Sequence, residues 1–263
     1  MKPDRRRRLL ELTMGHWVGG TKMVEYTDYN NVKNEEEFVR YTNYGSPFNK
    51  AIADNNLEIV GYGLYHYGNS TNNSKKRKGE DFVNQKDSIS YTPLMHVAEA
   101  EIVGAEEKNT KIATMLLKHP KIDPNIQDEF GKTALHYAVY GSEGGMNPNV
   151  VKLLLAHPKI DPNIQDKFGK TALHYAVSKI NPNVVELLLD HPKIKTEIKD
   201  ENDETPYNIL ESIIVNTRRN EDKDDEDDIE RIAQMFETHR LYEAHPPPAY
   251  PPPPPAPPTQ FKF

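Results

Sequence analysis

Histidines are the residues of this sequence that most readily suggest chemistry, because they can bind metal ions or transfer protons. Three of them precede a proline at regular spacing: His119, His157 and His191. Steps of 38 and 34 residues predict one such histidine per structural unit, too far apart to share a zinc ion. The sequence has no cysteine and no Gly-x-x-x-x-Gly-Lys, His-Glu-x-x-His or Gly-x-Ser-x-Gly motif. We therefore expect no catalytic residue, no metal ion and no cofactor, and a protein that is not an enzyme.

Charge and hydropathy narrow the classes of partner. The formal net charge of −7 argues against a broad contact with nucleic acid, which needs clustered positive charge. The segment after Arg5–Arg8 is interrupted by Glu11 and His16, so it lacks the apolar run of a cleaved signal peptide. No stretch approaches the roughly 18 apolar residues of a membrane helix. We expect a cytoplasmic protein that binds neither nucleic acid nor membrane, with export by a signal-independent route left open.

The chain contains an internal repeat. Residues 128–165 read DEFGKTALHYAVYGSEGGMNPNVVKLLLAHPKIDPNIQ, and residues 166–199 read DKFGKTALHYAVSKINPNVVELLLDHPKIKTEIK. Self-similarity at this period indicates stacked supersecondary units, each too small to bury a core of its own. Looser copies of the pattern occupy 41–67, 87–127 and 200–242. The expected fold class is therefore all-α: a solenoid of about five stacked helix-turn-helix units joined by β-turns.

This repeat pattern divides the chain into segments of three kinds: terminal segments, a linker and repeat units. The predicted segments are 1–40 (unassigned), 41–67 (a degenerate unit), 68–86 (a polar linker), 87–127, 128–165 and 166–199 (units), 200–242 (a divergent unit with an acidic insertion) and 243–263 (a proline-rich disordered tail).

Each unit carries signals that start and stop two helices. A Ser or Thr opens the first helix, where its oxygen can accept an unpaired backbone N–H. These residues are Ser46, Thr92, Thr133, Thr171 and Thr205. The second helix has a wide apolar stripe, VVKLLL at 150–155 and VVELLL at 184–189. Such a stripe suits a helix that packs against its partner and against both neighbouring units, and the His-Pro pairs that follow end the helix.

The TALHYA sequences at 133–138 and 171–176 resemble the T-P-L-H-x-A signature of ankyrin repeats. The resemblance covers about 41–242 and is strongest over 87–205. It departs from the family where His-Pro replaces the usual glycine after the second helix, and where insertions separate helices. It implies a non-enzymatic scaffold that binds a partner protein, with His136 and His174 hydrogen-bonded between repeats.

The HPKIDPN turns resemble those of ankyrin proteins from host-associated, intracellular bacteria. This resemblance implies delivery into a host cell and action on host proteins.

The family resemblance also places the contact surface on the turn tips and on the exposed face of the first helix. The positions that it carries over are Phe130, Lys132, Tyr137, Tyr140, Phe168, Lys170, Tyr175, Ser178 and His96, with Glu99 beside His96. Aromatic rings combined with lysines provide contact area of the kind that binding surfaces favour. The alternative is structural: the phenylalanines would pack turn against turn, and the tyrosines would pack within the fold.

The C-terminal tail is a second candidate contact. Residues 246–258 read PPPAYPPPPPAPP, which predicts an extended polyproline II segment. Pro247, Pro248 and Tyr250 form the PPxY pattern read by WW domains, and Tyr250 with the prolines after it resembles ligands of EVH1 domains or profilin. The alternative is a stiff spacer without a ligand.

Two other functions stay open at this stage. The repeats could be the accessory region of an enzyme, although neither flank has the length to build a core of its own. They could also form a degenerate repeat protein with no specific ligand.

Overall fold

The computed structural model describes residues 52, 56–64, 83–99, 106–141, 147–220 and 225–244. These residues form helices and irregular segments without a strand. The helices are α4 (Leu57–Gly63), α5 (Pro93–Glu99), α6 (Glu106–Leu117), α7 (Ala134–Tyr140), α8 (Pro148–Leu155), α9 (Ala172–Ser178), α10 (Pro182–Leu189), α11 (Pro206–Asn220) and α12 (Glu226–Ala244). The predicted all-α fold is confirmed. The predicted segment 1–40, most of the linker 68–86 and the tail from residue 245 lie outside the described residues.

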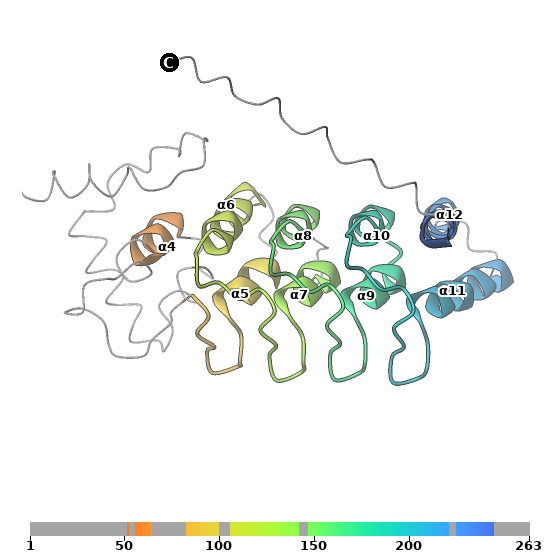
Figure 1. The fold of residues 1–263 in the computed structure, drawn as a ribbon, viewed down its shortest axis with the longest axis horizontal. Helices are drawn as coiled ribbons and strands as arrows, with labels where there is room; N and C mark the ends of the chain where they lie inside the picture. The colour runs from red at the N-terminus through yellow and green to blue at the C-terminus, as the bar shows by residue number, and fades with distance from the viewer. Residues whose placement is uncertain are drawn as a thin grey trace, which may run out of the picture.

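The helices form two rows (Figure 1). We call α5, α7, α9 and α11 the inner row, and α4, α6, α8, α10 and α12 the outer row. Neighbours within each row pack against one another, and successive helices such as α7 and α8 pack across the rows. Because each described helix pair packs mainly against the pairs beside it, apolar burial accumulates unit by unit, as in a solenoid.

The outer helices α8 and α10 begin at asparagine caps. The side chains of Asn147 and Asn181 accept hydrogen bonds from the backbone N–H of Val150 and Val184, at 3.2 and 3.1 Å. Proline occupies the first position of each helix, where its missing N–H has no helical partner to lose. Leu154 is fully buried between the rows, as the wide apolar stripe predicted.

The last unit is completed by α12, which packs against both α11 and α10. This helix begins within the predicted divergent unit 200–242 and ends just beyond it. Ile232 is fully buried, and Ile229 and Phe236 are nearly so. The first turn carries Glu226, Asp227 and Asp228, whose negative charge suits the N-terminus of a helix.

A tight loop precedes each inner helix and projects away from the outer row (Figure 1). We call loops 87–91, 128–132, 166–170 and 200–204 the first, second, third and fourth fingers. The aspartate at the base of each finger closes it: Oδ1 of Asp128 accepts the N–H groups of Phe130 and Lys132 at 2.9 and 2.7 Å. The aspartates that act in this way are Asp87, Asp128, Asp166 and Asp200.

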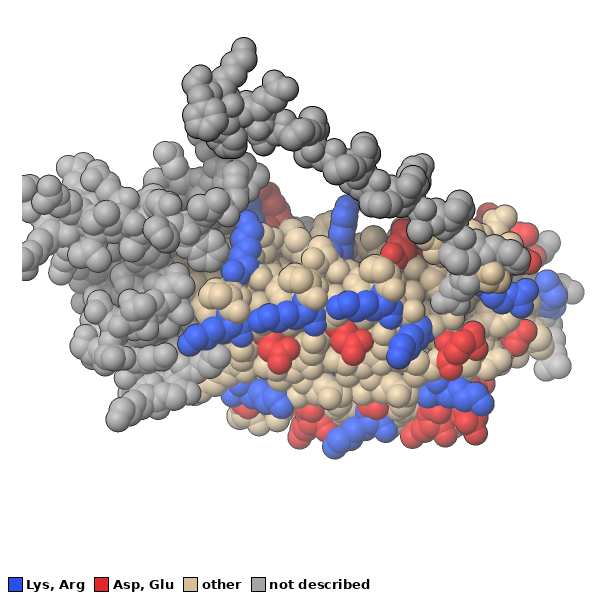
Figure 2. Space-filling model, in the orientation of Figure 1, with Lys and Arg blue, Asp and Glu red and all other residues tan. Residues whose placement is uncertain are grey.

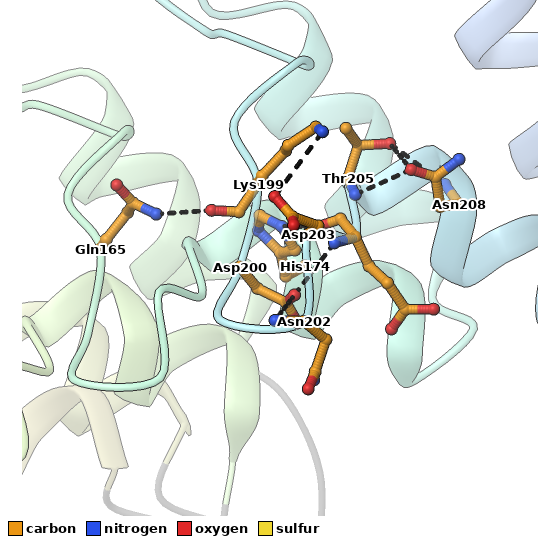
Figure 3. A network of polar contacts seen from close by, with 9 residues as sticks. Gln165, His174, Lys199, Asp200, Asn202, Asp203, Thr205 and Asn208 are labelled. Atoms are coloured by element: carbon orange, nitrogen blue, oxygen red, sulfur yellow. Dashed lines mark hydrogen bonds and ion pairs between the residues drawn. The ribbon is translucent and has the colours of Figure 1, made fainter.

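Polar side chains form hydrogen bonds between successive units. The amide of Gln165 donates to the carbonyl oxygens of Gly169 at 2.6 Å and of Lys199 at 2.9 Å (Figure 3). Asn125 donates to the Lys159 carbonyl at 2.7 Å and accepts the Asp161 N–H at 2.9 Å. Backbone bonds join the fingers directly, from Lys167 N–H to the Phe130 carbonyl and from Glu201 N–H to the Phe168 carbonyl. These bonds fix the spacing of adjacent fingers.

Candidate protein-binding face

Large apolar side chains remain exposed on the fingers and on the inner helix α7. Ile89, Phe130 and Phe168 stand at the same place in the first three fingers, and they are 52%, 50% and 47% exposed. Tyr140 in the last turn of α7 is 43% exposed. A side chain that packed fully between turns would be buried, so about half of each phenylalanine is available to another molecule. We call Ile89, Phe130, Phe168 and Tyr140 the apolar row.

Two of the predicted contact tyrosines are tied to the fold by their hydroxyl groups. Tyr137 donates to Oδ2 of Asp128, and Tyr175 donates to Oδ2 of Asp166 at 2.5 Å. Tyr137 is only 5% exposed, so the expectation of an exposed ring at this position is wrong. Burial, reinforced by the hydrogen bond to a carboxylate, raises the pKa of both tyrosines. Tyr137 is therefore a buried residue, whereas the Tyr175 ring stays partly accessible.

Lys132 lies among the aromatic rings of this face. Its Nζ is 4.6 Å from the centroid of the Tyr140 ring and 5.1 Å from that of Tyr175. The centroids of the two rings are 5.4 Å apart in an edge-to-face arrangement, and Lys179 Nζ lies 4.9 Å from the Tyr140 centroid. Cation–π contacts of this kind are worth about 0.5–1 kcal/mol each at exposed sites. They hold two positive charges beside the apolar row without neutralising them.

The remaining predicted contact residues have mixed placements. Lys170, in the third finger, is partly exposed. Ser178 is exposed, and its hydroxyl donates to the His174 carbonyl at 2.8 Å. His96 occupies in α5 the position that Tyr137 and Tyr175 occupy in the next inner helices, and its Nε2 lies 2.7 Å from Oδ2 of Asp87. Binding by these residues stays a prediction.

His136 and His174 hold the units together, as the family resemblance implied. Nδ1 of His136 accepts the backbone N–H of Thr133 at 3.1 Å, so the ring proton belongs on Nε2, which faces the Lys170 carbonyl at 3.1 Å. His174 makes the same pair of contacts with Thr171 and Glu204. Burial lowers the pKa of both histidines. Both rings are therefore neutral at pH 7 and have a structural role.

The histidines of the His-Pro turns are also structural. Nδ1 of His157 accepts the N–H of Lys159 at 3.3 Å, and Nδ1 of His191 accepts that of Lys193 at 3.2 Å. Across the described part of the chain, no three metal-ligating side chains come together.

The fourth finger departs from the pattern of the others, and sequence reasoning missed this. Oδ1 of Asp200 accepts the N–H of Asn202 at 2.8 Å and that of Glu204 at 3.2 Å (Figure 3). Oδ2 of Asp200 is buried and has no hydrogen-bond partner among the residues that the structure describes. The residue nine positions on, where Asp128 and Asp166 have a tyrosine, is Ile209. Comparing the four finger sequences at this spacing would have revealed the difference.

The fold and this face together define a class of protein: a repeat scaffold in which paired helices carry a row of rigid fingers. The sequence matches the family model described as ankyrin repeats (3 copies) over residues 48–165 and 101–202, which together cover more than half of the chain. The chain belongs to the ankyrin-repeat family. Ankyrin repeats generally mediate protein–protein interaction, and proteins built from them are typically non-enzymatic scaffolds.

A solved structure supports the same fold. The crystal structure of EF0377, an ankyrin repeat protein, matches with a TM-score of 0.53 and 24% sequence identity, and the match covers 73% of this chain and 79% of that one. No curated protein matches the sequence. Among the described helices, none is long and apolar enough to cross a membrane.

Proposed function

We propose that the fingers and the inner helices bind a partner protein through the apolar row. The observation that carries this proposal is the repetition of one half-exposed apolar side chain at the tips of three successive fingers. Buried core residues and hydrogen-bonding side chains recur in repeats because each unit needs them to fold. Exposed phenylalanines have no such structural reason, and aromatic residues are the side chains that most often anchor protein interfaces.

The rigidity of the fingers favours tight binding. Each finger is closed by its aspartate, and the second, third and fourth fingers are joined by backbone hydrogen bonds of 2.9 and 3.0 Å. The binding surface is therefore ordered before a partner arrives. An ordered surface loses little conformational entropy on binding, which leaves more of the contact energy as affinity.

The test replaces the three aromatic residues of the apolar row and leaves Tyr137 and Tyr175 in place. The variant Phe130→Ala/Tyr140→Ala/Phe168→Ala should lose capture of a partner from lysate while it keeps its far-UV helical signal. A matched control is Leu241→Ala/Tyr242→Ala, because these side chains on α12 are 56% and 60% exposed but lie on the outer row. If the control loses a partner that the triple variant still captures, the apolar row is not the binding surface.

A second contact is proposed for the tail, on the strength of its sequence. Pro247, Pro248 and Tyr250 supply the PPxY pattern of WW-domain ligands, and EVH1 domains or profilin are the other candidate receptors for this stretch. Two contacts on one chain would raise the effective concentration of each for a common partner. Tyr250→Ala should abolish binding to a purified WW domain; unchanged binding would leave the tail as a spacer.

The HPKIDPN turns favour a partner inside a host cell, and thus a bacterial protein that acts on host proteins. Comparing the proteins captured from host and bacterial lysates tests this proposal, and a partner found only in the bacterial lysate would argue against it.

The alternative is that the repeats are the accessory region of an enzyme. In that case, mass spectrometry of lysate proteins should reveal a group transferred to them in the presence of this protein.

A further inference from the structure

The charge on the fingers reverses sign between the third and the fourth. The third finger carries Lys167 and Lys170, whereas the fourth carries Glu201, Asp203 and Glu204. The two fingers lie side by side, because the Glu201 N–H donates to the Phe168 carbonyl at 3.0 Å. Figure 2 shows Asp and Glu side chains gathered at the edge of the stack below α11. A step from positive to negative charge therefore occurs over the width of one repeat.

The charges of the two fingers do not pair with each other within the described part of the chain. No ion pair of 4.0 Å or less joins the third finger to the fourth there. Oδ1 of Asp203 lies 3.7 Å from Nζ of Lys199, the residue just before the fourth finger (Figure 3). The two side chains are 90% and 59% exposed. Such an exposed pair contributes little. Both charged fingers are thus open to charges on another molecule.

Asp200 adds a buried charge to the fourth finger. Asp200 is more than nine-tenths buried, and no described residue donates to its Oδ2, although the corresponding oxygens of Asp128 and Asp166 accept a tyrosine hydroxyl. An unpaired buried carboxylate oxygen strengthens the negative potential around it, because the interior screens charge weakly. This end of the stack therefore attracts a cation more strongly than the exposed carboxylates alone would.

The apolar row ends at the same place. The tip position occupied by Phe130 and Phe168 is taken by Asn202 in the fourth finger. Along the fingers, the second and third carry an exposed phenylalanine with lysine beside it, and the fourth carries three carboxylates and no apolar side chain at its tip. This order distinguishes the two directions along the stack.

We propose that the partner is a polypeptide segment with a matching order of side chains: apolar residues on Phe130 and Phe168 with a carboxylate beside them, opposite Lys167 and Lys170, and then a lysine or arginine opposite the fourth finger. Complementary charges fix the register and direction of a bound segment and speed its association. This inference rests on the proposed function, since it assigns the chemistry of the ligand to the same face.

The test selects peptides from a displayed random library on the full-length protein and measures their Kd by fluorescence polarisation. Recovered peptides should carry apolar, acidic and basic residues in one order. Exchanging the acidic and basic residues within a peptide should weaken binding about tenfold. The variant Glu201→Lys/Glu204→Lys should bind the selected peptide about tenfold more weakly than the original protein does. Replacing the basic residue of the peptide by glutamate should restore binding to that variant.

Controls separate local from general charge effects. Glu230→Lys/Glu237→Lys on α12 makes the same change in net charge on the outer row, at exposed positions, and should leave the Kd unchanged. If the lysine variant fails to fold, Glu201→Gln/Glu204→Gln removes the charge without reversing it. This glutamine variant should still bind the selected peptide more weakly than the original protein does.

The outcomes test the charge order separately from the proposed binding of a partner through the apolar row. Peptides that need Phe130 and Phe168 but tolerate exchange of their charges overturn the charge order and leave the binding face intact. Recovery of no peptide with the three kinds of side chain also overturns the charge order. Peptides that bind equally to the Phe130→Ala/Tyr140→Ala/Phe168→Ala variant overturn the binding face itself.

Discussion

The hydroxyl of Tyr137 donates a hydrogen bond to Oδ2 of Asp128, and so ties the inner helix α7 to the base of the finger before it. Oδ1 of the same carboxylate closes the finger by accepting two backbone N–H groups. One side chain therefore sets both the shape of the finger and its angle to the helix. Asp166 and Tyr175 repeat the arrangement one unit on.

This relationship predicts a loss of stability when the hydroxyl is removed. Tyr137→Phe and Tyr175→Phe should each lower the free energy of unfolding by about 2 kcal/mol, because a hydrogen bond to a charged group is lost and a carboxylate oxygen stays unpaired. Urea denaturation followed by circular dichroism measures the change. Tyr140→Phe is the matched control, since no hydrogen bond of its hydroxyl occurs among the described residues and its ring is exposed. Equal losses in all three variants would contradict this account.

The repeat architecture could be predicted from the sequence because the units at 128–165 and 166–199 are near copies of each other. Near identity fixes the register, and the register fixes which residues face the core, such as Leu154 and Leu188. The pairing of α12 with α11 was harder to predict, because an acidic insertion separates the two helices. Their packing became visible only in the structure.

The binding face was only partly predictable. Tyr137 and Tyr175 occupy one position of the repeat, yet Tyr137 is buried and Tyr175 is partly exposed. A neighbour differs between the two: the ring of Tyr91, in the less regular first finger, covers Tyr137, with ring centroids 4.8 Å apart and planes tilted by 49°. A repeat pattern assigns the same role to both tyrosines. It cannot describe a contact that a single unit makes.

Acid should destabilise the stack through its buried histidines. Burial lowers the pKa of His136 and His174 in the folded chain, so the unfolded chain binds more protons once the pH falls below about 6.5. The stabilisation is fully present above that pH. It is lost as the pH falls, with a slope approaching about 1.4 kcal/mol per pH unit for each histidine. Urea midpoints measured from pH 7.5 down to pH 5 should therefore decrease.

A control for this pH dependence comes from the chain itself. In the last unit, Oδ1 of Asn208 accepts the Thr205 N–H at 3.0 Å, the bond that a histidine accepts in the two units before. His136→Asn/His174→Asn should therefore keep the caps, lower stability at pH 7.5 and flatten the decrease below pH 6.5. A decrease of unchanged slope would assign the effect to other groups, including His157 and His191, whose pKa values burial also lowers.

The finger glycines should not tolerate a side chain. Gly131 and Gly169 have φ values of 78° and 72°, and a Cβ on either would lie 2.9 or 2.8 Å from a backbone nitrogen of the next finger. Alanine at either position should cost about 2–3 kcal/mol, from left-handed strain and from separation of the fingers. Asp203→Ala is the control: its φ is 61°, but the described residues after it form no further finger, so a loss of about 1 kcal/mol or less is expected. Thermal melts of the three variants test the ranking.

Restoring the missing tyrosine of the last unit should stabilise the chain. α7, α9 and α11 begin six residues after Asp128, Asp166 and Asp200, so Ile209→Tyr places a hydroxyl where Tyr137 and Tyr175 have theirs. A bond to the unpaired Oδ2 of Asp200 should gain about 1–2 kcal/mol relative to Ile209→Phe, which has the same ring without the donor. The comparison of tyrosine with phenylalanine removes the effect of replacing the partly buried isoleucine. Unfolding of the two variants at the same urea concentration would contradict the prediction, because it would mean that the new hydroxyl forms no stabilising bond with Asp200.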